Sequence, residues 1–155
     1  MPPVIQVVVG TTRPGRFADK PVAWLVDRLE GRADLALEVL DLRDHPLPFY
    51  EATVPPARSR RDCPNEAVAR LGRAIDRADG FVFVTAEYNH GYPAALKNAM
   101  DHVFPEFNRK LVAFVGYGNV GGARAERGRS SSCARWGWNP RWPPCATPFT
   151  SCPTS

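Results

Sequence analysis

Short apolar runs recur along the chain, and the earliest is VIQVVVG at residues 4–10. Such a continuous β-branched run is typical of a strand that is covered on both faces of a parallel sheet. Two later runs have the same character, GFVFVT at residues 80–85 and KLVAFVGYG at residues 110–118. LALEVLDL at residues 35–42 alternates between apolar and polar positions and indicates another strand. The pattern therefore predicts four strands.

Apolar residues at helical spacing separate these strands. Segment 21–32 places Val22, Leu25 and Leu29 on one face, and segment 65–77 repeats the pattern with its own apolar residues. Segment 93–104 opens with a proline, which is common in the first turn of a helix. Parallel strands need right-handed crossovers, and these place helices on both faces of the sheet. The sequence therefore predicts a three-layer α/β fold with a doubly wound parallel sheet.

Two segments do not follow this alternation. HPLPFYEATVPPARSRRDCP, residues 45–64, contains too much proline for a helix or a strand and predicts a long surface loop. From Glu126 onward the chain has five prolines, three of its four tryptophans and no lysine, with neither a helical nor a strand period. We therefore expect one domain at residues 1–125 and an irregular tail at residues 126–155.

The composition of the tail has two interpretations. It fits GC-rich DNA that is translated in a shifted reading frame. When residues 129–155 are back-translated with GC-rich codons and reread one base earlier, a helix pattern followed by a β-branched strand appears. We favour this interpretation, and a disordered tail is the alternative.

Composition and charge narrow the class of protein. A chain of 155 residues with 44% hydrophobic content can form one domain with a core. The tail holds four arginines against one acid, and therefore three of the four net positive charges, so the domain itself does not indicate a nucleic-acid partner. No apolar run approaches the roughly 20 residues that span a bilayer, and the N-terminus lacks the features of a signal peptide. We expect a cytoplasmic protein without a membrane partner.

The cysteines do not indicate a metal site or a disulfide framework, because they lack CxxC or Cys/His ligand spacing. They are Cys63, Cys133, Cys145 and Cys152.

The first loop with candidate chemistry is GTTRPGRFADK, residues 10–20, between the first strand and the first helix. In doubly wound sheets, ligands bind at the carboxyl ends of the strands and phosphates bind at a helix N-terminus. The loop lacks the GxGxxG pattern that accommodates a pyrophosphate. Its polar side chains suit a terminal phosphate monoester instead, and they are Thr11, Thr12, Arg13 and Arg16. The alternative is an ordinary polar loop with two solvated arginines.

The second loop is AEYNHGYP, residues 86–93, which follows the third strand. In the flavodoxin-like strand order the third strand lies beside the first, so both loops reach one crevice. A flat heteroaromatic ring needs aromatic walls and amide groups at its polar edge, and four residues supply these, Tyr88, Asn89, Gly91 and Tyr92. His90 is a candidate proton donor or orienting group, although an exposed loop histidine is more often neither.

A third loop, GYGNVGGARA at residues 116–125, flanks the same crevice, either as a ligand contact or as a flexible connection. No Ser/His/Asp or Cys/His set has the context for nucleophilic catalysis, so we predict no catalytic side chain.

Together the three loops resemble the NAD(P)H-dependent FMN reductases of flavodoxin-like fold, which include bacterial quinone, chromate and azo-dye reductases. The most specific segment is AEYNHGYPAALKNAMDH at residues 86–102, which is similar to the family's PEYNHGYPAALKNALD and has Ala86 in place of a proline. The similarity covers residues 4–125. Family members continue with a helix, a fifth strand and a final helix, which the tail does not resemble. We therefore expect the last strand and helix to be missing or disordered.

The resemblance implies a role for each loop. The FMN phosphate is held by Thr11, Arg13 and Arg16; the isoalloxazine is lined by Glu87, Tyr88, Asn89 and His90; the opposite lip is formed by Gly116, Tyr117 and Gly118. It also implies an oxidoreductase, a homodimer or homotetramer, that passes hydride from NADPH or NADH to FMN and on to a quinone, free flavin or similar acceptor. Two alternatives stay open, a flavin-binding electron carrier or sensor without nicotinamide turnover, and an inactive frameshifted remnant.

Overall fold

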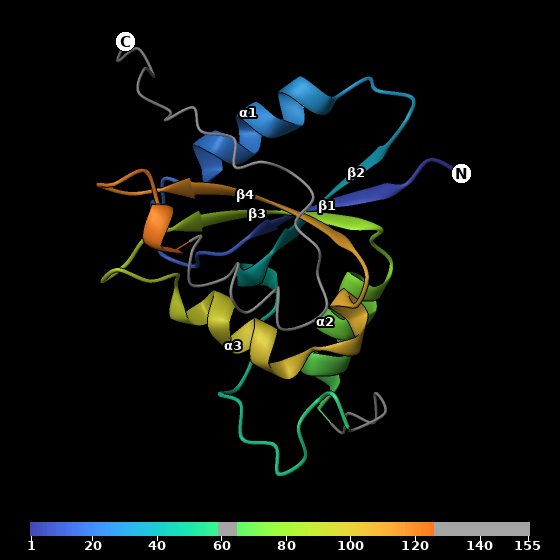
Figure 1. Ribbon diagram of the computed structural model, residues 1–155, viewed down its shortest axis with the longest axis vertical. Coiled ribbons are helices and arrows are strands. Elements are labelled where there is room, and N and C mark those ends of the chain that lie inside the picture. Colours follow the sequence, from blue (N-terminus) through green and yellow to red (C-terminus); the bar gives the residue numbers. More distant parts are fainter. Residues whose placement is uncertain (59–64, 126–155) are drawn as a thin grey trace.

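A computed structural model describes residues 1–58 and 65–125 of the chain. Within these residues four strands form one parallel sheet in the order β2-β1-β3-β4. The strands are β1 (Val4–Val9), β2 (Ala36–Asp41), β3 (Gly80–Ala86) and β4 (Leu111–Tyr117). Helix α1 (Asp19–Leu29) covers one face of the sheet, and α2 (Glu66–Asp76) and α3 (Ala94–His102) cover the other (Figure 1). The predicted three-layer, doubly wound fold is confirmed, with the first strand beside the third.

The helices begin where local chemistry favours a start. The Asn65 side chain accepts hydrogen bonds from the backbone N–H groups of Ala67 and Val68, at 2.9 and 3.3 Å, and so caps α2. Helix α1 begins at Asp19, two residues before the predicted segment 21–32. Pro21 therefore lies in the first turn, where its missing N–H removes no helical hydrogen bond. Two short 3₁₀ turns are also present, η1 (Leu42–Asp44) and η2 (Pro105–Phe107).

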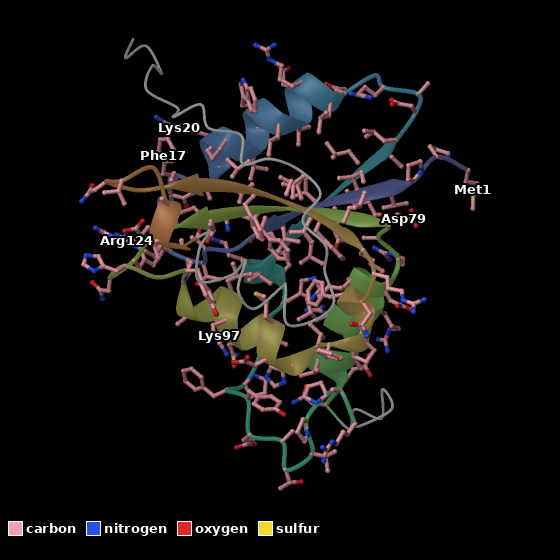
Figure 2. All side chains as sticks on the ribbon, viewed as in Figure 1. Met1, Phe17, Lys20, Asp79, Lys97 and Arg124 are labelled. Atoms are coloured by element: carbon pink, nitrogen blue, oxygen red, sulfur yellow. The ribbon has the colours of Figure 1, made fainter. Side chains whose placement is uncertain are left out.

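The register of the sheet brings the three candidate loops to one edge. Val9 pairs with both Asp41 of β2 and Val84 of β3, and Tyr117 of β4 pairs with Ala86. All four strands run in the same direction, so the segments that follow β1, β3 and β4 leave the sheet together. Phe17 and Arg124 lie at this carboxyl edge, and Met1 lies at the opposite end of the sheet (Figure 2).

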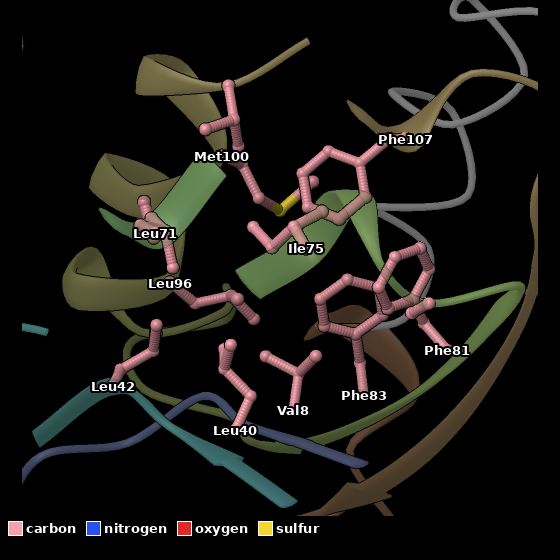
Figure 3. Packing of buried hydrophobic residues seen from close by; sticks show 13 residues of the cluster. Val8, Leu40, Leu42, Leu71, Ile75, Phe81, Phe83, Leu96, Met100 and Phe107 are labelled. Carbon is pink, nitrogen blue, oxygen red and sulfur yellow. The ribbon is translucent and has the colours of Figure 1, made fainter. Parts of the chain in front are cut away.

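Two apolar clusters hold the layers together. The larger lies between the sheet and helices α2 and α3, where the ring centroids of Phe81 and Phe107 are 5.1 Å apart (Figure 3). The smaller lies under α1 and contains Val7, Val9 and Val84. Burial on both faces explains why β1 and β3 are continuous apolar runs. At Gly10 a Cβ atom would lie 2.9 Å from Leu96 Cδ2, so glycine lets α3 approach the start of the first loop.

The structure bears on the predicted surface loop and on membrane spans, but not on the tail. Residues 45–58 of the predicted surface loop contain no helix or strand. No helix of the described chain is both long and apolar enough to cross a membrane. The predictions about the tail, its reading frame and the last strand and helix concern residues 126–155, which lie outside the described residues.

Candidate functional site

Three loops meet at the carboxyl edge of the sheet, and backbone hydrogen bonds fix where each begins. Gly10 donates its N–H to the Val84 carbonyl at 2.9 Å, and Glu87 donates its N–H to the Tyr117 carbonyl at 2.9 Å. The Arg13 guanidinium lies over the Tyr88 ring, 5.6 Å from its centroid. The structure therefore brings the first predicted loop against the second, as the strand order requires.

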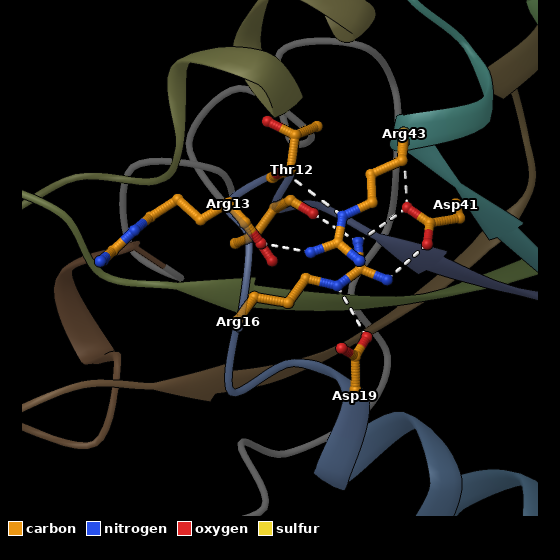
Figure 4. A network of polar contacts seen from close by, with 7 residues as sticks. Thr12, Arg13, Arg16, Asp19, Asp41 and Arg43 are labelled. Carbon is orange, nitrogen blue, oxygen red and sulfur yellow. Dashed lines mark hydrogen bonds and ion pairs between the residues drawn. The ribbon is translucent and has the colours of Figure 1, made fainter.

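Arg16 stabilises the first loop from within the protein, with only 5% of its side chain exposed. Both terminal nitrogens donate to the Asp41 carboxylate at the end of β2, and Nε donates to Asp19 Oδ1 at 2.7 Å (Figure 4). Nη1 also donates to the Thr11 carbonyl at 2.6 Å. The hydrogen bonds to Asp41 raise the pKa of Arg16 further above its ordinary value. Arg16 thus ties the loop to both β2 and α1.

Arg43 holds the same loop from the same side, and nothing in the sequence pattern had marked it. Its guanidinium donates to the Arg13 carbonyl and, at 3.5 Å, to the Thr12 carbonyl. Its backbone N–H donates to Asp41 Oδ1 at 3.0 Å. Asp41 lies at the carboxyl end of a predicted strand, where ligands bind in such sheets. This position was the one sequence signal that could have identified Asp41 as part of the site.

The carbonyl groups of Thr11, Thr12 and Arg13 all accept hydrogen bonds from Arg16 or Arg43. All described peptide bonds are trans, so each carbonyl points opposite to the N–H of the next residue. The N–H groups of Thr12 and Arg13 therefore point away from the two guanidinium groups. Successive N–H groups on one side of a loop form a concavity that binds anions. These two N–H groups are donors that the loop would offer to a phosphate group.

Thr11 and Tyr117 each bury a hydroxyl group that has no hydrogen-bond partner of standard geometry among the described residues. Thr11 is completely buried. The Tyr117 ring packs against Phe17, with centroids 5.1 Å apart. Burial raises the pKa of Tyr117, while the nearby Thr11 hydroxyl lowers it. An unpartnered buried hydroxyl costs about 1–3 kcal/mol, so both groups fit a site that receives a polar ligand.

The second loop is a two-residue hairpin. Tyr88 and Gly91 exchange backbone hydrogen bonds of 2.8 and 3.0 Å, and between them Asn89 and His90 have φ angles of 48° and 65°. Positive φ at both central residues is the signature of a type I′ turn. Asn89 and His90 are both exposed at its tip. The sequence pattern predicted the loop but not this turn, because type I′ turns usually have glycine at the second central position, and here it is histidine.

Glu87 joins the second loop to the third. Its carboxylate accepts hydrogen bonds from the backbone N–H and the guanidinium of Arg124, at 3.3 and 3.2 Å. A Cβ atom at Gly118 would lie 2.9 Å from Glu87 Cβ, so this close approach requires glycine. Gly122 has φ +75°, and a Cβ there would lie 2.5 Å from the Tyr117 nitrogen. The glycines of the third loop are therefore requirements of its fold and not of flexibility.

The predicted site residues thus share one edge but have different surroundings. Thr12 and Arg13 are exposed and Thr11 is buried, while the side chains of Arg16 and Glu87 are engaged within the protein. Tyr117 lies beside the first loop, on the α1 side of the sheet. In the ranges 1–58 and 65–125 no group of three or more His, Cys, Asp or Glu side chains is arranged to hold a metal ion.

Several known reductases are similar to this chain in sequence. An NAD(P)H-dependent FMN reductase of Schizosaccharomyces pombe is 38% identical over 120 residues, which cover 77% of this chain and 60% of that protein. A quinone reductase of Pseudomonas putida is 35% identical over 97 residues, covering 63% of this chain and 47% of that protein. The chain therefore spans about half to two thirds of the length of such curated relatives.

Solved structures show the same fold. The flavoenzyme NAD(P)H:(acceptor) oxidoreductase FerB of Paracoccus denitrificans has a TM-score of 0.72 and 28% identity, covering 92% of this chain and 76% of that one. The model of the NADPH-dependent FMN reductase family matches residues 3–139, which include all three loops. On this match the chain belongs to the NADPH-dependent FMN reductase family.

Proposed function

We propose that the chain acts as an FMN-dependent oxidoreductase that takes electrons from NADPH or NADH and delivers them to a small acceptor such as a quinone or free flavin. One observation carries the proposal: a loop shaped to bind an anion lies against a loop that presents an aromatic ring, where Arg13 covers Tyr88 at 5.6 Å. FMN has a phosphate at one end and a flat ring system at the other. When bound, FMN would accept hydride from the nicotinamide and pass the electrons on.

The phosphate end is assigned to the first loop. The Thr11 hydroxyl and the N–H groups of Thr12 and Arg13 supply donors for the phosphate oxygens, and the exposed Thr12 and Arg13 side chains add a hydroxyl and a charge. The assignment of Arg16 to the phosphate stays a prediction. Its hydrogen bonds to Asp41 and Asp19 support a role in fixing the loop.

The ring end is assigned to the second and third loops. Tyr88 supplies an aromatic wall, and the exposed turn of Asn89 and His90 supplies polar groups beside it. Gly91 has no side chain to cover its backbone, which lets a flat ring approach closely. The assignment of Gly116 and Gly118 to the ring rests on the family resemblance. Glu87 acts here through Arg124, because its carboxylate holds the two loops together.

The relatives support a choice of acceptor, and the surface supports an assembly of several copies. The Pseudomonas putida relative is a quinone reductase, which supports a quinone as acceptor. We expect a homodimer or homotetramer, as the family resemblance implies. The Phe49 ring is 84% exposed in segment 45–58, and a second copy would cover such an apolar group. Light scattering after size-exclusion chromatography measures the mass of the assembly, and a monomeric mass would contradict this part of the proposal.

The function is tested with the purified full-length chain. We expect it to bind FMN with a stoichiometry of one per chain and to oxidise NADPH or NADH when a quinone is supplied. A protein that stays colourless after incubation with excess FMN would exclude a flavoenzyme. A yellow protein that oxidises neither nicotinamide in the presence of quinones would instead be an electron carrier or sensor.

A further inference from the structure

Tyr117 ends β4, and its side chain lies on the face of the sheet that α1 covers. Its ring packs beside the buried cluster that contains Val9 and Val84, and Phe17 covers it at a centroid distance of 5.1 Å. This position places the Tyr117 hydroxyl near the first loop. The role that the family resemblance implies for Tyr117, in the lip of the flavin site that residues 116–118 form, stays a prediction.

Thr11 and Tyr117 lie at the same level of this edge, because Thr11 follows Val9 by two residues, Val9 pairs with Val84, and Ala86 two residues further on pairs with Tyr117. The Thr11 hydroxyl also lowers the pKa of Tyr117. The backbone of Thr11 is held on both sides, because Gly10 donates to Val84 at 2.9 Å and the Thr11 carbonyl accepts from Arg16 at 2.6 Å. The two hydroxyls are the unpartnered buried side-chain groups of this edge among the described residues. Each hydroxyl is able to donate one hydrogen bond and to accept others.

Two adjacent hydroxyl groups have two protons to donate, and a hydrogen bond between them uses only one. If Tyr117 donates to Thr11 Oγ1, the proton of Thr11 is left to be donated elsewhere. The ordinary pKa of a tyrosine is 10.0, so the Tyr117 phenol keeps its proton at neutral pH and is able to donate it. The N–H groups of Thr12 and Arg13 lie in the same loop and are able to donate as well. An anionic oxygen in the loop would accept from all three groups.

We propose that Tyr117 is a positioning residue for the FMN phosphate: its hydroxyl has no partner among the described residues, and when FMN binds it donates to Thr11 Oγ1, so that the Thr11 hydroxyl donates its own proton to a phosphate oxygen. The inference rests on the proposed function, since it takes the first loop to hold the phosphate of FMN. Tyr117 then favours FMN over riboflavin, which has the same ring system and no phosphate.

The test compares the dissociation constants of FMN and riboflavin, measured by quenching of flavin fluorescence in the full-length chain. Tyr117→Phe removes only the hydroxyl group. We expect this variant to bind FMN about three- to tenfold more weakly, the effect of one hydrogen bond, and to bind riboflavin as the wild type does. Tyr50→Phe makes the same chemical change in segment 45–58, outside the three loops, and serves as the matched control, with both constants unchanged.

A double-mutant cycle tests whether the effect passes through Thr11. In a Thr11→Val background the substitution Tyr117→Phe should no longer change FMN affinity, because no threonine hydroxyl remains to be oriented. Thr11→Ser keeps a hydroxyl and should retain most of the dependence on Tyr117. A thermal unfolding curve of each variant checks that it folds, and removal of an unpartnered buried hydroxyl is not expected to lower stability.

The outcomes separate this inference from the function on which it rests. Equal weakening of FMN and riboflavin in Tyr117→Phe would place Tyr117 at the ring and overturn the inference, as would an unchanged FMN affinity. Both results leave the flavoenzyme proposal intact. A wild-type chain that binds no flavin would overturn the proposed function and the inference with it. Equal wild-type affinity for FMN and riboflavin would show that the loop does not hold a phosphate.

Discussion

Single side chains fix the shape of the first loop, and Arg16 makes the most hydrogen bonds. It joins Asp41, Asp19 and the Thr11 carbonyl with only 5% of its side chain exposed. Such a residue contributes to ligand binding in either of two ways, through its charge or through the loop that it holds. Arginine and lysine carry the same charge, but only arginine offers a planar fork that matches a carboxylate.

Arg16→Ala is expected to weaken FMN binding by roughly 1.5–3 kcal/mol, the range for hydrogen bonds to charged groups, and to lower the thermal midpoint. Arg16→Lys distinguishes the two ways. If Arg16 fixes the loop, lysine should lose nearly as much affinity as alanine, because it cannot bridge Asp41 and Asp19 with the same geometry. Full affinity in the lysine variant, measured by flavin fluorescence, would show that charge alone matters.

The Asp41 carboxylate makes the stability of the loop sensitive to acid. Burial alone would raise its pKa, but the Arg16 guanidinium and the Arg43 N–H outweigh burial and hold the pKa of Asp41 below the ordinary value of 3.8. The stabilisation from ionised Asp41 is therefore fully present above this value and is lost as the pH falls through the lower folded-state pKa. Asp41→Asn removes this titration.

We expect the wild type to unfold at a higher temperature than Asp41→Asn near pH 6, and the difference to shrink below pH 4. Thermal unfolding measured from pH 3 to 7 checks this. A difference that stays constant over the whole range would mean that the ionised carboxylate does not stabilise the loop.

At the scale of the element, the hairpin of the second loop holds backbone strain. His90 has φ 65°, a region that costs a residue with a side chain roughly 1–2 kcal/mol and costs glycine almost nothing. His90→Gly should therefore raise the free energy of unfolding by about 1 kcal/mol. If the imidazole also contacts bound flavin, FMN affinity should fall at the same time. Urea denaturation and flavin titration measure the two effects, and a lower stability would contradict the assigned turn.

The third loop offers a matched pair of glycines. Gly121 and Gly122 both have positive φ, 67° and 75°, but only at Gly122 would a Cβ atom collide with backbone, 2.5 Å from the Tyr117 nitrogen. Gly121→Ala should lower the free energy of unfolding by about 1 kcal/mol from strain alone. Gly122→Ala should lower it clearly further and reduce bound FMN. Similar losses in the two variants would show that the loop relaxes around the added methyl group.

Sequence periodicity predicted the elements and the edge where the loops meet, because burial on two faces leaves a continuous apolar record in β1 and β3. It did not predict the ion pair between Arg16 and Asp41, since these residues are 25 positions apart and nothing in the sequence singles out Asp41 as a partner. The contact of Arg43 with the Arg13 carbonyl could not be predicted at all. Every residue has a backbone carbonyl, so the sequence does not show which carbonyl will accept a hydrogen bond.

Glu87 and Tyr117 show the limit of assigning roles by motif. Both lie in segments that match the family, and their roles at the isoalloxazine stay predictions. Within the protein the Glu87 carboxylate accepts from Arg124, and the Tyr117 ring packs against Phe17. A motif records which residues are needed at a site and not which groups they contact.

At the scale of the whole molecule, β2 is an edge strand of the described sheet, and its end holds the first loop through Asp41 and Arg43. Edge strands fray locally at a lower free energy than central strands. Each fraying event at the end of β2 would release the three carbonyls that give the loop its shape. The residence time of FMN would then depend on the opening of a strand that the cofactor does not touch.

Amide hydrogen exchange makes this dependence visible. FMN is expected to slow exchange at the backbone amides of residues 38–41, and Asp41→Asn should speed both exchange there and flavin dissociation by similar factors. Exchange that stays the same with and without FMN would mean that the loop keeps its shape while β2 opens. In the expected case, an edge strand that does not contact the cofactor would control its release, and the fraying of β2 would set how long FMN stays bound.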